Sequence, residues 1–415
     1  METARLIDRF PAGIVRPPSS KSLGHRAVIC AALADGESII REVSLSEDIQ
    51  ATLGGAAALG ARWRAEGDTL FVSGSVGAGS PHPYNVIDCG ESGSTLRFLI
   101  PVAALAAHET VFTGRGRLME RPMETYARVF ADAGIFFQQE PGRIRVSGPL
   151  RGGTYALAGD VSSQFISGLL LALPLCGEAS ELHLTTALES APYVTLTLDV
   201  MRRFGVEVEQ GNDIFRVPGG QKYRSCDYIL ESDYSQAAFF LAAAALGRPV
   251  RCAGLNPDSS QGDRAILDVL RDMGADVTWE DGLVSAHAKR LRSVTVDVRA
   301  CPDLAPPIAA LMCFCEGTSH IVNAARLRFK ERDRLSALAG ELGKLGAGIE
   351  EGPDSLTIHG KPSLPGGQAD GTGDHRISMA VAVAAIRCDG PVRLTGSESV
   401  NKSYPGFWND FGGNS

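Results

Sequence analysis

Basic residues gather near the starts of expected helices, although the 415-residue chain carries a formal net charge of −8. Two acidic residues, Asp303 and Glu331, lie in the same segments. Cations set against an acidic background favour small, highly charged anions as ligands, and carboxylates beside them could exchange protons with such ligands. The alternative is a set of surface salt bridges, which stabilise a protein little. The basic residues are Lys21, Arg26, Arg97, Arg121, Lys330, Arg334, Arg376 and Lys402.

The first of these segments, residues 17–26, combines several groups that hold anions. Two prolines keep the chain extended before a helix begins, so that Lys21 and Ser22 fall in its first turn. Arg26 lies on the same side, one turn later. Backbone N–H groups, a hydroxyl, an ammonium and a guanidinium together suit a phosphate or a carboxylate. The sequence lacks the GxxxxGK[ST] pattern of a P-loop, which disfavours an ATPase of that class.

Small and polar residues open the helices expected further along. Gly93 follows Ser92 before an apolar run and would let a ligand approach the backbone closely. Arg121 precedes Pro122, a residue favoured in the first turn of a helix, so its guanidinium would need an anion to compensate the helix dipole. Hydroxyls and an amide stand at other expected helix starts. Capping is the alternative interpretation for Ser162, Ser163 and Gln164, whereas Ser190 and Tyr193 could supply further neutral hydrogen bonds.

The second half of the chain adds carboxylates to the cations. Asp303 follows Pro302 at an expected helix start, where it could be an N-cap or an ionised base. Lys330 and Arg334 are four residues apart, which predicts one shared helix face, and Glu331 is three residues before Arg334. A salt-bridged surface helix would look similar. Neither carboxylate has metal-ligand spacing to a histidine, so a metal enzyme is disfavoured.

These helix starts recur about every seventy residues along the whole chain. Each repeat is predicted to contain a strand, a buried helix, a strand, an exposed helix and two strands joined by a turn. The last repeat lacks its final strands, and residues 4–15 at the N-terminus are expected to complete it. Equivalent helix N-termini that face one cleft would bind anions. The polar residues that open the buried helices are Ser20, Ser92, Ser162, Asp233, Asp303 and Asp374.

Composition limits the class of protein. The longest apolar runs, such as residues 98–107 and 239–246, are shorter than the roughly 18 residues of a spanning helix, and no signal peptide precedes the first expected strand. Nine scattered cysteines without a CxxC pair favour a reduced, cytoplasmic protein without structural zinc. The acidic balance argues against nucleic acid as the main partner. We therefore expect a cytoplasmic protein that binds neither membranes nor nucleic acid.

In this order, the segments from Pro17 to Lys402 resemble the 5-enolpyruvylshikimate-3-phosphate (EPSP) synthase family, the 3-phosphoshikimate 1-carboxyvinyltransferases. The resemblance implies an α/β fold, a two-domain inside-out α/β barrel in which each domain has three βαβαββ units. The helix N-termini would face the interdomain cleft. The expected domains are residues 20–231, mainly on the shikimate 3-phosphate side, and residues 1–19 with 232–415. Closure of the domains around the substrates is expected as well.

The implied reaction transfers the enolpyruvyl group of phosphoenolpyruvate to the 5-hydroxyl of shikimate 3-phosphate and releases phosphate. It passes through a tetrahedral ketal and uses neither a metal nor an organic cofactor. Lys21 would contact both substrates and assist proton transfer, Asp303 would be the base for the 5-hydroxyl, and Glu331 would handle the methylene proton. The two small molecules are the expected partners, and a monomer is expected.

Positions that match the family's motifs divide between the two substrates. Asp374 and His375 would position Arg376. The residues expected to bind phosphoenolpyruvate are Lys21, Gly93, Arg121, Gln164, Arg334, Arg376 and Lys402. The residues expected to bind shikimate 3-phosphate are Lys21, Ser22, Arg26, Ser162, Ser163, Gln164, Ser190, Tyr193, Asp303 and Lys330.

Some positions depart from the family pattern, and two other functions stay open. Glu91 and Ser94 stand where many relatives carry asparagine and threonine, which leaves sensitivity to glyphosate undecided, and His25 replaces a common asparagine. One alternative is the sister enolpyruvyl transferase that acts on UDP-N-acetylglucosamine, but its hallmark loop cysteine is missing from residues 113–120. The other alternative is a non-catalytic anion-binding repeat protein, against which the presence of an acid–base set speaks.

Overall fold

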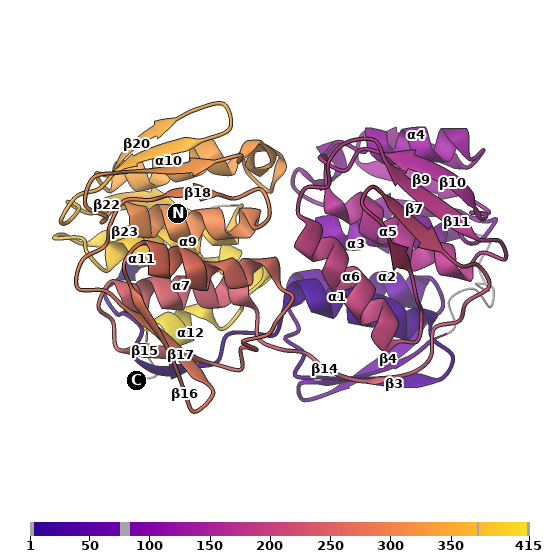
Figure 1. Ribbon diagram of the computed structural model, residues 1–415, viewed down its shortest axis with the longest axis horizontal. Helices are drawn as coiled ribbons and strands as arrows, with labels where there is room; N and C mark the ends of the chain where they lie inside the picture. Colours follow the sequence, from indigo (N-terminus) through magenta and orange to yellow (C-terminus); the bar gives the residue numbers. More distant parts are fainter. Residues whose placement is uncertain (1–3, 75–83, 372, 413–415) are drawn as a thin grey trace. The chain divides into compact units, whose positions relative to one another are not determined.

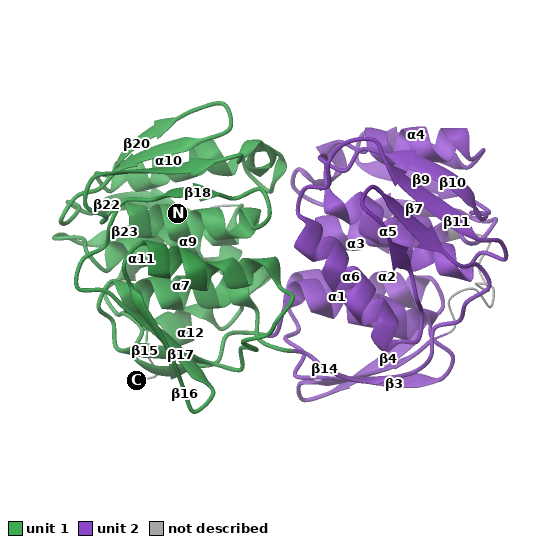
Figure 2. Cartoon of the chain, viewed as in Figure 1, with its two compact units in different colours: residues 1–18, 231–415 green, residues 19–230 purple. Residues whose placement is uncertain are grey.

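The computed structural model describes residues 4–74, 84–371 and 373–412 (Figure 1). The chain divides into two units, which Figure 2 distinguishes by colour. Unit 1 contains residues 1–18 and 231–415, and unit 2 contains residues 19–230. Each unit is built from repeats of one design.

Unit 2 contains three four-stranded sheets, in the orders β14-β3-β5-β4, β6-β7-β9-β8 and β10-β11-β13-β12. In each sheet the first two strands are parallel and the others join antiparallel. Strand β14 comes from the far end of the unit and completes the first sheet. The strands are β3 (Glu37–Arg41), β4 (Arg62–Glu66), β5 (Thr69–Ser73), β6 (Tyr84–Asp88), β7 (Glu109–Thr113), β8 (Phe136–Glu140), β9 (Arg143–Ser147), β10 (Gly153–Leu157), β11 (Ser180–Leu184), β12 (Glu209–Gln210), β13 (Ile214–Val217) and β14 (Asp227–Ile229).

The helices of unit 2 are of two kinds. Helices α1 (Lys21–Leu33), α3 (Gly93–Ala103) and α5 (Ser163–Ala172) are buried over most of their length, as expected of helices in the core of a unit. The others bury one side only: α2 (Glu47–Ala58), α4 (Glu124–Asp132) and α6 (Ala191–Arg203), with the short 3₁₀ helices η1 (Leu118–Glu120) and η2 (Leu173–Leu175).

Unit 1 repeats this design in the sheets β2-β15-β17-β16, β18-β19-β21-β20 and β22-β23-β1. The first two strands of each sheet are again parallel, and those that follow are antiparallel. The strands are β1 (Arg5–Ile7), β2 (Gly13–Val15), β15 (Val250–Ala253), β16 (Asp276–Glu280), β17 (Leu283–His287), β18 (Thr295–Asp297), β19 (Thr318–Val322), β20 (Gly348–Glu351), β21 (Leu356–His359), β22 (Gly367–Asp370) and β23 (Val392–Thr395).

The N-terminal segment is shared between two sheets of unit 1. Strand β1 pairs with β23 and completes the last repeat, as predicted. The prediction was wrong for β2, which pairs with β15 in the sheet of the fourth repeat. Pro11 lies between the two strands, and a proline has no N–H to donate, so the segment does not continue as one strand.

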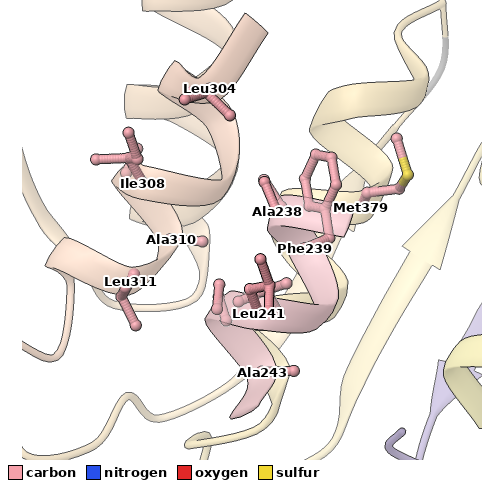
Figure 3. Close-up of a cluster of buried hydrophobic side chains, with 14 of the residues drawn as sticks. Ala238, Phe239, Leu241, Ala243, Leu304, Ile308, Ala310, Leu311 and Met379 are labelled. Atoms are coloured by element: carbon pink, nitrogen blue, oxygen red, sulfur yellow. The ribbon is translucent and has the colours of Figure 1, made fainter. Parts of the chain in front are cut away.

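Three buried helices form the centre of unit 1: α7 (Tyr234–Ala245), α9 (Ala305–Met312) and α11 (His375–Ala385). Every residue of α7 is buried, and Figure 3 shows Phe239 and Leu241 of α7 near Ile308 and Leu311 of α9 and Met379 of α11. None of the helices formed by the described residues is long and apolar enough to cross a membrane. The other helices are α8 (Ile266–Asp272), α10 (Arg334–Lys344), α12 (Phe407–Gly412), η3 (Gly262–Ala265), η4 (Pro302–Leu304), η5 (Ala325–Phe329) and η6 (Ser397–Lys402).

Polar caps begin five of the six buried helices, as the sequence predicts. Their side chains accept a hydrogen bond from a backbone N–H in the first turn. Asp303 is the exception, because it lies inside η4, ahead of α9, and its side chain makes no capping bond. The N-cap interpretation of Asp303 was therefore wrong, and its carboxylate is available for other partners. The five caps are Ser20, Ser92, Ser162, Asp233 and Asp374.

Helix α5 approaches α3 closely because position 168 has no side chain. A Cβ added to Gly168 would overlap the hydroxyl of Tyr126 and the carbonyl oxygen of Arg97. We expect Gly168→Ala to lower the free energy of unfolding by about 1–3 kcal/mol, the cost of overpacking a core. The matched control is Gly54→Ala on α2, where a Cβ meets nothing within 4 Å, and that variant should gain about 0.5–1 kcal/mol. Urea denaturation of both variants measures the difference, and equal stabilities would contradict the packing argument.

Candidate active site

The start of α1 places Lys21 against a carboxylate of α2. Ser20 caps the helix, accepting a hydrogen bond from the backbone N–H of Leu23. Lys21 is the first residue of α1, and its Nζ lies 2.6 Å from Oδ2 of Asp48, whose side chain is 7% exposed. The ammonium is therefore held in one direction by a nearly buried partner. Asp48 was not among the predicted site residues.

Arg26 joins α1 to the first two turns of α6. Its Nε donates to Oγ1 of Thr197 at 2.7 Å, Nη1 to the carbonyl of Ser22 at 2.6 Å and Nη2 to the carbonyl of Tyr193 at 2.8 Å. The guanidinium also lies over the ring of Phe98. Burial lowers the pKa of Arg26 to about 10, so it stays charged at neutral pH. Three predicted residues, Ser22, Arg26 and Tyr193, are thus brought together.

Ser190 precedes α6 in a backbone conformation that few residues other than glycine adopt. Its φ is +54°, in the left-handed region, and its side chain makes no capping bond. The predicted helix start is confirmed, since α6 begins at the next residue. Such conformations often mark functional sites, where surrounding structure imposes them.

Helices α3 and α5 bring together a set of residues that we call the guanidinium–amide cluster: Gly93, Arg97, Arg121 and Gln164. Nη1 of Arg97 donates to Oε1 of Gln164 at 2.7 Å, and Nε2 of Gln164 donates to Oγ of Ser94 at 2.9 Å. A Cβ at position 93 would lie 2.7 Å from Nη1 of Arg121 and 3.4 Å from Nη1 of Arg97. The missing Cβ at Gly93 leaves room for both guanidinium groups beside this helix start.

Two details of the guanidinium–amide cluster differ from the sequence prediction. Arg121 follows η1, and α4 begins only at Glu124, so Pro122 is not in the first helical turn. Gln139 of β8 donates to the carbonyl of Arg121 and holds this connection outside the helix. Arg97 was counted among the cations but assigned to no substrate. Its position one turn after Gly93 is the sequence signal that could have placed it here.

In unit 1, Arg334 binds three carboxylates. Its Nε lies 2.7 Å from Asp374, Nη1 lies 2.9 Å from Asp303 and Nη2 lies 2.9 Å from Glu331. The side chain of Arg334 is only 2% exposed. Burial alone would lower the pKa of Arg334, but Asp374, Glu331 and Asp303 outweigh it and raise the pKa. The guanidinium is permanently charged and fixes the positions of all three acids.

Further cations surround two of these carboxylates. Asp303 lies 3.2 Å from Nη2 of Arg376 and 3.3 Å from Nζ of Lys330, and Nζ of Lys402 lies 3.1 Å from Glu331. Burial would raise the pKa of Asp303, but its three cationic neighbours hold that pKa well below the ordinary value. Burial also lowers the pKa of Lys330, partly offset by Asp303. We call the whole set the acid–base cluster: Asp303, Lys330, Glu331, Arg334, Asp374, Arg376 and Lys402.

Helix α10 begins later than the sequence suggested. Asp333 is its N-cap, accepting hydrogen bonds from the backbone N–H groups of Leu335 and Ser336. Lys330 therefore lies outside the helix, and the prediction that it shares a helix face with Arg334 was wrong. Both cations nevertheless meet because each binds Oδ1 of Asp303.

Ser235 supports Arg376 and was not predicted. Nη2 of Arg376 donates to Oγ of Ser235 at 2.9 Å, and that hydroxyl donates to Oδ1 of Asp233 at 2.6 Å. The cap of α7 thereby reaches the arginine that binds Asp303. A serine two residues after an N-cap aspartate is a weak sequence signal, because many helices begin in this way.

Comparison with known proteins identifies the family. The family model described as EPSP synthase (3-phosphoshikimate 1-carboxyvinyltransferase) matches residues 11–411. The 3-phosphoshikimate 1-carboxyvinyltransferase of Clostridium kluyveri is 44% identical to this chain over 96% of the chain and 94% of that protein. A solved EPSP synthase from Acinetobacter baumannii superimposes with a TM-score of 0.81 at 26% identity, covering 99% of this chain and 98% of that one.

This chain belongs to the EPSP synthase family. A relative from Clostridium acetobutylicum with the same name is 43% identical, over 96% of this chain and 94% of that protein. The likeness to EPSP synthase structures confirms the predicted two-domain inside-out α/β fold.

The low pKa of Asp303 predicts how the stability of this EPSP synthase homologue depends on pH. An aspartate pKa that is lower in the folded than in the unfolded state stabilises the fold above the unfolded pKa, about 3.9, and this contribution is lost as pH falls through the folded pKa. Asp303→Asn should lower the free energy of unfolding at pH 7 by about 3 kcal/mol, because three cations lose their common partner. The deficit relative to the native protein should shrink below about pH 4.

Chemical denaturation between pH 3 and pH 8 measures this effect. Asp268→Asn is the matched control, since Asp268 on α8 pairs with Arg271 at the surface with 70% of its side chain exposed. The control should follow the native protein at every pH. A pH-independent deficit in Asp303→Asn would contradict the assignment.

Proposed function

We propose that this chain transfers the enolpyruvyl group of phosphoenolpyruvate to the 5-hydroxyl of shikimate 3-phosphate and releases phosphate. The family match and the names of the curated relatives support this reaction. The structural observation that carries the proposal is the acid–base cluster, in which two carboxylates that could transfer protons are held among four cations that could bind anions.

The reaction needs two proton movements. A proton is added to the CH2 carbon of phosphoenolpyruvate while the 5-hydroxyl oxygen bonds to C2 and loses its own proton, which gives a tetrahedral ketal. The C2–O bond to phosphate then breaks, and the new methyl group loses a proton to restore the double bond. We assign Asp303 as the base for the hydroxyl, Glu331 as the group that exchanges the methylene proton, and Lys21 as the residue that assists proton transfer.

Substrate binding is proposed for residues of both units. Phosphoenolpyruvate carries a phosphate and a carboxylate, which suit the guanidinium–amide cluster and the cations of the acid–base cluster. The residues for phosphoenolpyruvate are Lys21, Gly93, Arg121, Gln164, Arg334, Arg376 and Lys402. The residues for shikimate 3-phosphate are Lys21, Ser22, Arg26, Ser162, Ser163, Gln164, Ser190, Tyr193, Asp303 and Lys330. Arg97 joins the first group on the strength of its bond to Gln164.

Two further expectations belong to the proposal. A cytoplasmic location is supported by the nine cysteines, all of which are free thiols. We also propose that the protein acts as a monomer.

Phosphate release distinguishes the proposed reaction from the alternative on UDP-N-acetylglucosamine. The protein should release phosphate from phosphoenolpyruvate when shikimate 3-phosphate is present and not when the nucleotide sugar replaces it. A colorimetric phosphate assay with each acceptor measures both outcomes. Release with the nucleotide sugar alone would overturn the choice of substrate, and release with neither acceptor would favour a non-catalytic anion-binding protein.

Removing either proposed acid should abolish most of the turnover. We expect Asp303→Ala and Glu331→Ala each to lower kcat by at least about a hundredfold, the usual contribution of a general acid or base. Asp268→Ala, which alters an exposed surface carboxylate, is the control for purification and folding. Circular dichroism should show the native helix content in all three proteins. Near-native turnover in either cluster variant would refute the role assigned to that residue.

A further inference from the structure

A buried chain of hydrogen bonds crosses three helices of unit 2. It begins at His25 on α1, whose Nδ1 lies 2.7 Å from Oγ1 of Thr52 on α2. That hydroxyl lies 2.7 Å from Oγ1 of Thr95 on α3, and Thr95 in turn donates to Oγ of Ser92 at 2.8 Å. None of the four side chains is more than 1% exposed. The chain therefore joins two successive repeats inside the unit.

The series of hydrogen bonds connects Lys21 with the start of α3 at Gly93, both of which the proposed function uses. The hydroxyls of Thr52 and Thr95 both face the carbonyl oxygen of Asp48, at 3.3 and 3.4 Å. The carboxylate of the same Asp48 binds Lys21 at 2.6 Å. At its other end, Ser92 caps α3 directly before Gly93 of the guanidinium–amide cluster. A shift in this series of hydrogen bonds would thus move both Lys21 and the start of α3.

The protonation state of His25 determines which group donates in each of these hydrogen bonds. Burial lowers the pKa of His25 to about 3, so the imidazole is neutral at physiological pH. Its Nε2 has no hydrogen-bond partner among the described residues. A buried N–H without an acceptor is rarer than a buried acceptor without a donor, so the single proton belongs on Nδ1. His25 then donates to Thr52, Thr52 to Thr95, and Thr95 to Ser92.

We propose that His25 is a positioning residue for Lys21 and for the N-terminus of α3. It touches no substrate, because its side chain is only 1% exposed. Its Nδ1–H sets the direction of the hydrogen bonds, which hold α2, the helix that carries both Thr52 and Asp48, in register with the Ser92 cap of α3. This inference rests on the proposed function, in which Lys21 and Gly93 bind phosphoenolpyruvate. It adds to that function a link between two neighbouring repeats, because the hydrogen bond between Thr52 and Thr95 joins them.

Substitution of Thr52 tests the proposal. Thr52→Val keeps the shape of the side chain but removes the hydroxyl, whereas Thr52→Ser keeps the hydroxyl. We expect Thr52→Val to raise KM for phosphoenolpyruvate about five- to tenfold, the effect of one lost hydrogen bond, and Thr52→Ser to stay within about twofold of the native protein. Loss of folded protein alone would lower the apparent kcat and leave KM unchanged.

Thr110→Val on β7 is the matched control. Thr110 is fully buried and its hydroxyl has no hydrogen-bond partner among the described residues, so its removal should leave KM unchanged. An unchanged KM in Thr52→Val, with the native protein active, would overturn the inference and leave the proposed function intact. An inactive native protein would instead refute the proposed function.

The tautomer of His25 provides a readout that does not depend on activity. Long-range ¹⁵N–¹H NMR of the imidazoles should show a protonated Nδ1 and an unprotonated Nε2 for His25, without change between pH 5 and pH 8. His25→Asn, which retains an N–H donor, should have a KM closer to the native value than His25→Leu. A proton on Nε2, or titration of His25 near pH 6.5, would refute the assigned direction.

Discussion

The buried guanidinium of Arg334 is the constraint on which the organisation of unit 1 depends. A charge that is 2% exposed is tolerated only when it is paired and hydrogen-bonded. Its three carboxylate partners come from different segments: Asp303 precedes α9, Glu331 precedes α10 and Asp374 caps α11. The need to neutralise one cation therefore fixes the relative positions of two central helices and the loop before α10, and it assembles the proposed acid and base as a consequence.

The two units carry different kinds of side chain at their equivalent helix starts. In unit 1 the helix starts carry carboxylates and cations in nearly equal number, which suits proton transfer beside an anion. In unit 2 the corresponding starts carry mainly hydroxyls, an amide and a glycine, with Asp48 as the carboxylate that holds Lys21. Neutral donors arranged around Arg97 and Arg121 favour binding over proton exchange. A shared repeat thus supplies equivalent positions, and the two units place different side chains on them.

The repeats and most of the capping residues could be predicted because they depend on local sequence. A polar residue before an apolar run signals a helix start, and the caps at Ser20 and Asp374 follow that rule. Asp303 does not follow this rule, because it lies in a 3₁₀ turn before α9, where its carboxylate caps no helix. The parts that were missed, such as Asp48 and Ser235, depend on contacts between separate helices, and no pattern within one segment reports such contacts. For Ser162, Ser163 and Gln164, the sequence pattern left capping as an equal alternative, and their assignment to substrates came from the resemblance to a known family and stays a prediction.

The position of cations at helix starts also links substrate binding to the strength of the proposed base. Arg376 is the second residue of α11, where the helix dipole disfavours positive charge, so its contacts with Asp303 offset an unfavourable position. An anionic substrate bound to Arg376 and Arg334 would compete with Asp303 for their N–H groups. Each bond that the carboxylate loses raises its pKa from the low value that the cations impose. The carboxylate would then become a better base at the moment when a substrate is in place, and in its absence it would remain an inert ion-pair partner.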